Sequence, residues 1–451
     1  MSAHEAAAEL ARRALALADG DEVEALASFE HAALTRFANN RIHQNVVERA
    51  HSVSVRVVVG GRQGVASTDR TDNEALVRCC ARAREAAVHA PDDPSFPGLP
   101  DPGLPDASFV PAAPDGPSLL DAFDADARAA AAVAIIAQSS ERGLTAAGTV
   151  SASVTGIAVA NSRGIDAAAT RSAARATVLS MHETGASGWA AWLGPDAASL
   201  PADSLGDRAA LLAARAVGAG PLEPGTYPVV LAPDAVADVV DFLGYTSFGA
   251  RAYHERRSFV ALHEGEQLFP ESFSLLDDAL DPATVGLPFD FEGVPKRRVP
   301  LVDRGRPVGV VTDSYWAARL ARPNTGHALP APNPYGPLPL NLAVEPGTAS
   351  IDEMISGIER GVYVTRFHYV NIEDPVSVLL TGMTRDGTFL IEDGRLTKPL
   401  RNARFTQSVV EALKGLRATG RDRELVGTED GGATLVPPLA LERWRFTGST
   451  G

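Results

Sequence analysis

The chain has 451 residues, of which 45% are hydrophobic and 22% charged, and its mean hydropathy is −0.02. This length predicts two or three domains, and the composition is typical of a folded soluble protein rather than a disordered or membrane-spanning one. The formal net charge is −15. Such a field repels nucleic acid and anionic lipid, so we expect neither a nucleic acid nor a membrane as partner.

Cysteine usage and the N-terminal segment both indicate a cytoplasmic protein. Cys79 and Cys80 are the only cysteines. They are adjacent in a predicted helix and point in different directions, so we expect no disulfide framework and no thiolate metal site. Segment 1–20 carries Arg12 and Arg13 where a signal peptide needs an uninterrupted apolar run, so we expect no signal peptide.

A proline-rich linker, residues 91–117, divides the N-terminal half into two modules, 1–90 and 118–219. It holds nine prolines in 27 residues, which leaves no room for regular structure. Both modules are predicted to run helix, strands, helix, which suggests an internal duplication. The strands are expected at 22–29, 34–37, 41–47, 52–59, 144–151 and 155–161, and the principal helices at 72–90, 119–142 and 205–217.

Residues 220–451 are predicted to form a larger, β-rich, peptidase-like domain. We expect a strand at 226–232, a helix at 234–243, a hairpin at 296–312 and strands at 362–370 and 377–384. Asp313 and Ser350 are predicted helix caps, and Asp386-Gly387 and Asp393-Gly394 are hairpin signals. The fold class is therefore α+β, with helix-flanked antiparallel N-terminal modules joined to this domain.

Two His-Glu pairs fail as zinc motifs, because a zinc-binding helix needs a second histidine four or five positions after the first. Neither His254-Glu255 nor His263-Glu264 has one. We expect solvated side chains on strands that flank residues 258–262. The sequence around Ser247 lacks the first glycine of a nucleophile elbow, and no phosphate-binding glycine-rich loop occurs.

Asp290 and Glu292 could form an acid/base pair, because alternate residues of an extended chain share a face. Beside the turn at 293–295, however, hydrogen bonds from backbone amides to these acids are the favoured interpretation.

Five prolines stiffen the long loop at 322–337, which carries Asn324, His327 and Tyr335. A long loop inside a compact domain is often functional. The loop could equally cover a sheet edge, and both interpretations stay open.

Six segments, in their order along the chain, resemble the TldD/PmbA family. They are Thr35-Arg36-Phe37-Ala38-Asn39-Asn40-Arg41-Ile42-His43-Gln44-Asn45, Gly60-Gly61-Arg62-Gln63-Gly64, Asn161-Ser162-Arg163-Gly164, Phe291-Glu292-Gly293-Val294-Pro295, Asn324-Thr325-Gly326-His327-Ala328 and Gly361-Val362-Tyr363-Val364-Thr365. The resemblance implies a cytoplasmic two-subunit peptidase. Its TldD-type subunit binds zinc through a His-Glu-x-x-x-His helix and a C-terminal cysteine, whereas the PmbA-type subunit, also called TldE, lacks this set.

The resemblance places the zinc motif on residues 240–245, where neither histidine is present. Val240 cannot coordinate a metal, and Asp241 with Tyr245 makes a poor site. Segment 427–432 also has no cysteine. The chain therefore resembles the PmbA branch, for which we expect no catalytic residue and no metal of its own, with zinc in the partner subunit.

The leading hypothesis is a non-catalytic subunit that binds unfolded proteins or small peptides for a TldD-type, HExxxH-bearing partner. One alternative is an autonomous hydrolase that uses His254, His327 or His368. Another is a peptide- or protein-binding modulator. Whether the chain forms a homodimer without the partner stays open.

Peptide binding is expected at the exposed edge that strands 362–370 and 377–384 can provide, because an extended peptide can add to such an edge. Arg366 and His368 would share one face, and Tyr363 and Thr365 the other. The loop residues Asn324, His327 and Tyr335 complete the candidate set. Alternatively, one of these strand faces is merely solvated.

Overall fold

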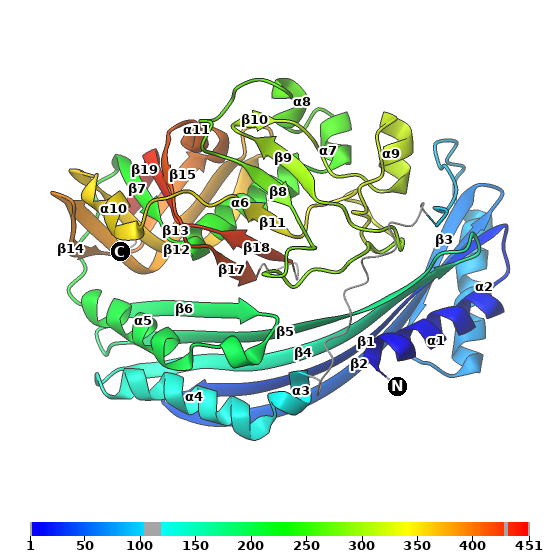
Figure 1. Cartoon of the computed structure of the whole chain (residues 1–451), viewed down its shortest axis with the longest axis horizontal. Coiled ribbons are helices and arrows are strands. Elements are labelled where there is room, and N and C mark those ends of the chain that lie inside the picture. The colour runs from blue at the N-terminus through cyan, green and yellow to red at the C-terminus, as the bar shows by residue number, and fades with distance from the viewer. Residues whose placement is uncertain (1, 103–118, 428–431, 450–451) are drawn as a thin grey trace.

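The computed structural model describes residues 2–102, 119–427 and 432–449. Its N-terminal half contains two units of helix, three strands and helix, and the six strands form one antiparallel sheet in the order β3-β2-β1-β4-β5-β6 (Figure 1). The elements are α1 (Ala3–Leu17), β1 (Glu22–Ala38), β2 (Arg41–Val59), β3 (Arg62–Thr68), α2 (Asn73–His89), α3 (Leu119–Ala122), α4 (Ala125–Ser140), β4 (Thr145–Asn161), β5 (Asp166–Met181), β6 (Ser187–Gly194), a 3-10 turn (Ala197–Ser199) and α5 (Ala202–Arg215).

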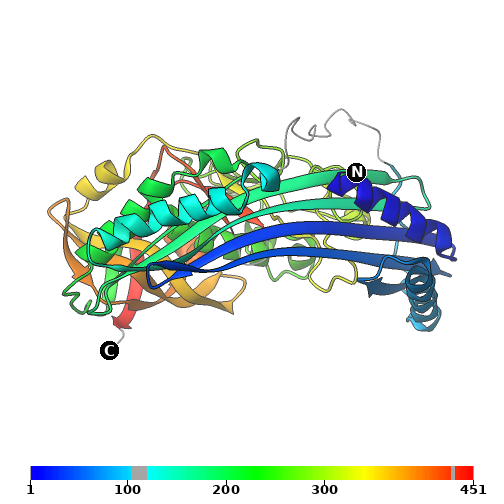
Figure 2. The ribbon, with the colours of Figure 1, turned by 90° about the horizontal axis from the view of Figure 1, so that it is seen from below.

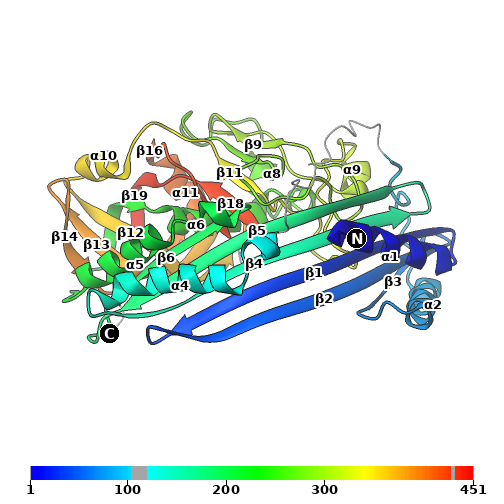
Figure 3. The ribbon, with the colours of Figure 1, turned by 60° about the horizontal axis from the view of Figure 1, so that its bottom comes forward.

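The central strands of this sheet are very long, and β1 alone has 17 residues, about 55 Å of extended chain. They run side by side along the molecule (Figure 3). The expectation of separate short strands at 22–29 and 34–37, at 41–47 and 52–59, and at 144–151 and 155–161 is wrong, because antiparallel pairing continues through the residues between them.

Alternation along the strands gives the sheet two different faces. Apolar residues of one face, among them Val23, Ala25, Val55 and Val57, pack against α1 and α2. Helices α4 and α5 cover the other end of the same face (Figure 2). The opposite face is turned toward the C-terminal domain (Figure 1).

In the C-terminal domain, two sheets surround the largest hydrophobic core. Its elements are β7 (Gly225–Leu231), α6 (Pro233–Ser247), α7 (Ala250–His254), α8 (Val260–His263), β8 (Leu275–Asp277), β9 (Val299–Asp303), β10 (Arg306–Pro307), α9 (Ser314–Leu320), β11 (Leu342–Val344), α10 (Ile351–Ser356), β12 (Arg360–Asp374), β13 (Leu379–Glu392), β14 (Arg395–Leu400), β15 (Ala403–Ser408), α11 (Val409–Lys414), β16 (Leu416–Thr419), β17 (Glu424–Gly427), β18 (Ala433–Val436) and β19 (Leu439–Ser449).

The larger sheet closes on itself, in the order β12-β7-β19-β15-β13 and back to β12. Strand β13 therefore has partners on both sides, so the expectation of a free edge at 377–384 is wrong. Strand β12 is paired on both sides at 362–364 and beyond this point pairs only with β13.

The fold class predicted from the sequence is confirmed: an α+β chain with antiparallel, helix-flanked N-terminal units and a β-rich C-terminal domain. The caps at Asp313 and Ser350 and the turn at Asp393-Gly394 are confirmed. Asp386-Gly387 instead interrupts the register inside β13, so the hairpin predicted there is wrong.

His254 and His263 end the short helices α7 and α8, so the prediction that they lie on strands is wrong. The linker at 91–117 and the domain limits stay predictions, and residues 103–117 fall outside the described ranges. No helix among the described residues is long and apolar enough to cross a membrane.

A buried ion triad joins the long sheet to the C-terminal domain. The Arg56 guanidinium, on β2, lies 2.8 Å from Glu24 on β1 and 3.1 Å from Glu292 of the C-terminal domain. All three residues are at most 9% exposed. Burial opposes the charge on Arg56, but the two carboxylates outweigh it and raise the pKa of Arg56, while burial raises the pKa of Glu24.

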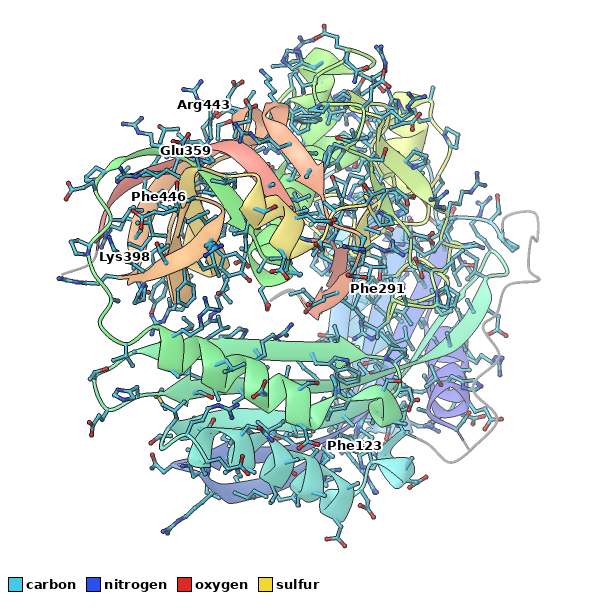
Figure 4. The ribbon with its side chains drawn as sticks, turned by 60° about the vertical axis from the view of Figure 1, so that its left-hand side comes forward. Phe123, Phe291, Glu359, Lys398, Arg443 and Phe446 are labelled. Atoms are coloured by element: carbon cyan, nitrogen blue, oxygen red, sulfur yellow. The ribbon has the colours of Figure 1, made fainter. Side chains whose placement is uncertain are left out.

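Beside the triad, the turn at 290–294 packs against the sheet. Phe291 lies where the C-terminal domain meets the long strands (Figure 4). Gly293 has φ 79°, and a Cβ there would come within 2.4 Å of Ile165. Only glycine allows this close approach in a left-handed conformation.

We predict that Arg56→Met destabilises the chain by about 3–5 kcal/mol at pH 8, because two buried carboxylates lose their cation. The folded-state pKa of Glu24 already lies above its ordinary value. Protonation therefore relieves the penalty as the pH falls, and the loss at pH 5.5 should be smaller. Urea unfolding at both pH values measures the effect, with Arg49→Met, at an exposed position of β2, as the control. An equal loss at both pH values would contradict this account.

Candidate functional site

Helix α6 carries the positions at which the family resemblance places a zinc motif. Val240 is fully buried and belongs to the main hydrophobic core. Asp241 is half-buried, and Tyr245 is 41% exposed near the end of the helix. The geometry does not fit a zinc ion, because the first ligand position holds an aliphatic side chain in the core. Nor do the described residues contain a group of three His, Cys, Asp or Glu side chains that could hold a metal.

The polar side of α6 carries three aspartates, which we call the aspartate row: Asp234, Asp238 and Asp241. Their spacing of four and three residues places them on one side of the helix. Burial, followed by the charges of Asp234 and Asp241, raises the pKa of Asp238 to about 8, although the Phe367 backbone and Arg366 act in the opposite direction. The spacing of the three aspartates is visible in the sequence. Only Asp241 was expected at a position of the zinc motif, and the sequence analysis did not single out Asp234 or Asp238.

Arg366 links β12 to the N-terminal sheet. It forms an ion pair with Asp386, and its guanidinium carbon lies 4.2 Å from the ring centroid of Trp189 on β6. Ser187, also on β6, donates a hydrogen bond to Asp386 at 2.6 Å. Arg366 is thus already engaged by both halves of the chain.

The other β12 candidates differ in exposure. Thr365 is buried and donates to the Gly387 carbonyl. Tyr363 is half-buried, and burial raises its pKa to about 12. The half-buried His368 lies beside Tyr369, with ring centroids 4.2 Å apart and an angle of 43° between the rings. Contacts of these residues with a peptide stay a prediction.

The loop 322–337 separates its three candidates. Asn324 donates to the Ser314 hydroxyl and accepts from the Gly326 amide, which fixes the loop. Tyr335 is 57% exposed, and its ring centroid lies 6.0 Å from that of Tyr245. The structure therefore brings together two candidates that are 90 residues apart in the sequence.

His327 is 1% exposed, so it cannot reach a ligand directly in this structure. Its Nε2 donates to Asp277 Oδ1 at 2.8 Å, and its Nδ1 lies 3.0 Å from Thr325 Oγ1. Burial, followed by the charge of Lys296, lowers the pKa of His327. The lowered pKa favours a neutral ring, and its contacts with Asp277 and Thr325 hold the neighbouring loop.

Asp290 accepts hydrogen bonds from backbone amides, which is the interpretation that the sequence analysis favours. Its carboxylate accepts from the amides of Glu292, Val294 and Ala328 at 2.8–3.0 Å. Burial and the charge of Glu292 nevertheless raise the pKa of Asp290 to about 7. An acid/base pair with Glu292 is not formed, because Glu292 is bound by Arg56.

Next to Asp290 lies a small inner cavity of about 40 Å³, which Lys296, Asn341 and Arg171 help to line. It adjoins a groove of about 440 Å³ over the face of the long sheet that is turned toward the C-terminal domain. Arg171, Val285 and Gly432 line both. No local sequence pattern indicates this pair of cavities, because their walls come from both halves of the chain.

Two family models match the sequence. Residues 224–448 match the PmbA/TldA metallopeptidase C-terminal domain, and residues 23–87 match PmbA/TldA metallopeptidase domain 1. Together they account for well over half of the chain.

Curated relatives are similar over shorter stretches. A metalloprotease of Methanothermobacter thermautotrophicus is 25% identical over 228 residues, 49% of each chain. A zinc metalloprotease TldD homolog of Saccharolobus solfataricus is 27% identical over 218 residues, 44% of each chain. The chain thus spans about half the length of these relatives or less.

Two solved structures share the fold across nearly the whole chain. TldE from Thermococcus kodakarensis has a TM-score of 0.85 at 20% identity, and the match covers 99% of this chain and all of that one. A putative modulator of DNA gyrase from Thermotoga maritima has a TM-score of 0.83 at 18% identity, covering 97% and 99%. With the two family models, these findings show that the chain belongs to the TldD/PmbA family of metallopeptidase-like proteins.

Proposed function

We propose that this chain is a non-catalytic, cytoplasmic subunit that binds unfolded proteins or small peptides for a zinc-bearing TldD-type partner. The observation that carries the proposal is the burial of Val240, on α6, in the main hydrophobic core. A zinc ion activates the attacking water in a metallopeptidase only when its ligands hold it. In this chain the helix has a packing role at the position where the zinc-binding subunit needs its first histidine.

The charges around α6 support the same proposal. Arg208 pairs with Glu424 at 3.0 Å and also lies near Asp234. The positive charge of Arg366 acts on Asp234 and Asp238 of the aspartate row. Carboxylates that are already neutralised by arginine or by protonation make weak ligands for a divalent ion.

An extended substrate can add to the outer part of β12, beyond Phe367, whose backbone is already bonded to Asp238 of the aspartate row. Among the described residues this outer part pairs only with β13, and Tyr369 and Asn371 are exposed there. A peptide that adds here would be bound mainly through its backbone, which suits a subunit that must accept many sequences.

The autonomous-hydrolase alternative is less well supported. Asp277, His327 and Thr325 are connected like an acid, a base and a hydroxyl nucleophile. The histidine ring is fully buried, however, and the Thr325 hydroxyl donates to the Thr312 carbonyl. A substrate carbonyl could not approach this hydroxyl without opening the loop.

We predict that mixing this chain with a TldD-type partner creates peptidase activity on an unfolded substrate that neither protein shows alone. The activity should disappear when the histidines of the partner's zinc motif are replaced by alanine. His254→Ala and His263→Ala in this chain are the matched variants, and we expect them to retain substantial activity. Peptide hydrolysis by this chain alone in the presence of a strong chelator would support the autonomous hydrolase instead.

We also predict that the purified and dialysed chain carries well below one zinc per molecule, because Val240 cannot act as a ligand. Elemental analysis measures the metal, with the TldD-type partner purified in parallel as the positive control. Stoichiometric zinc that resists a chelator would show that another ligand set exists in this chain.

A further inference from the structure

A row of small side chains crosses the floor of the groove over the long sheet. Ala32 of β1, Ser153 of β4 and Ala173 of β5 lie on neighbouring strands and line it. Small side chains let the backbone of a ligand approach the sheet closely. The groove therefore has the shape for an extended chain.

The described residues that line the groove carry a charge opposite to that of the whole molecule. The charged side chains among the described lining residues are Arg36, Arg171, Arg175 and Glu48, whereas the chain has a net charge of −15. No described residue forms a hydrogen bond or ion pair with the guanidinium of Arg36 or Arg175. Arg171 and Arg175 are four residues apart on β5, about 13 Å along the strand.

The amine of Lys296 lines the inner cavity. Lys296 is 9% exposed, and no described residue forms a hydrogen bond or ion pair with its ammonium group. The nearby carboxylates already have other partners: His327 and the Asn341 amide bind Asp277, and three backbone amides bind Asp290. Burial lowers the pKa of Lys296 and outweighs the charges of Asp277 and Asp290, which act in the opposite direction.

The inner cavity, of about 40 Å³, has room for a small polar group, because one water needs only about 10–15 Å³. A ligand carboxylate placed there would bring an acceptor to Lys296 and would lie beside Arg171, which lines both spaces. Hydrogen bonds between charged groups of this kind are stronger than neutral ones.

We propose that the groove and the inner cavity together bind a carboxylate-bearing peptide. The peptide lies extended over β1, β4 and β5, and its carboxylate, from the C-terminus or from an acidic side chain, is held by Lys296 and Arg171. Arg36 and Arg175 bind further acidic groups along the groove. This inference rests on the proposed peptide-binding function and adds a preference for acidic peptides.

The test is fluorescence anisotropy with the full chain and short N-terminally labelled peptides of otherwise identical sequence. One has a free C-terminus and neutral side chains, one has a C-terminal amide, and one has a C-terminal amide and an internal glutamate. We expect the free acid, the glutamate peptide or both to bind about tenfold more tightly than the neutral amide. Comparison of the two acidic peptides identifies the source of the carboxylate.

Variants locate the site. Lys296→Met should reduce the affinity for the preferred acidic peptide to that for the neutral amide. Arg36→Gln and Arg175→Gln are at exposed positions that tolerate substitution, and each should weaken binding of that peptide about threefold. Arg49→Gln is the matched control, because Arg49 lies on β2 one residue beyond Glu48 and so points to the opposite face. It should change nothing.

Equal binding of acidic and neutral peptides, or displacement of all of them by inorganic phosphate at equal concentrations, would overturn the inference. The inference would also be overturned if Arg36→Gln, Arg175→Gln and Lys296→Met all bound acidic peptides more tightly than the neutral amide to the same degree as the unchanged protein. If peptidase activity still appears on mixing with the partner, the proposed function stands without the carboxylate preference. If no peptide binds and no activity appears, both fail.

Discussion

The buried triad of Glu24, Arg56 and Glu292 is the interaction on which the arrangement of the two halves depends. It places one guanidinium between a carboxylate of the long sheet and a carboxylate of the C-terminal domain. Ion pairs of this kind add little net stability, but they are costly to break, and they therefore select one docking position among many. The close contact of Gly293 with the sheet fixes the same position sterically.

That docking also creates the ligand-sized spaces. The segment from Val285 to Lys296 passes along the face of the sheet and forms a wall of the inner cavity, and Arg171 of β5 contributes from the other side. Neither half alone encloses this space. A ligand held between them would therefore bind both halves and oppose their separation.

Local signals in the sequence were sufficient for the caps at Asp313 and Ser350 and for the turn at Asp393-Gly394, because each acts within a few residues. Asp386-Gly387 carries the same turn signal but lies inside β13. There the long-range pairing with β12 outweighs the local preference for a turn. Continuous β1 and β4 likewise depend on pairing across more than 100 residues, which no local pattern reveals.

For the candidate site, the sequence supplied residue types but not their neighbours. Arg56 contacts Glu292 across 236 residues, and His327 contacts Asp277 across 50. That Val240 supplies no metal ligand follows from the sequence alone, because valine lacks a donor atom wherever it lies. The burial of Lys296 beside the inner cavity could not be predicted in this way, since burial is a property of the folded surroundings.

Local charge and net charge act on the groove at different distances. At physiological ionic strength charges are screened over about 8 Å, so the net charge of −15 repels an anion as it approaches but acts weakly once the anion is in the groove. There the nearby arginines and Lys296 dominate the electrostatic potential.

A small anion has only its charge to overcome the initial repulsion. A peptide also offers backbone hydrogen bonds and apolar contacts, so it can bind first through these and then place its carboxylate. The combination of an acidic surface and a basic groove therefore favours acidic peptides over free anions.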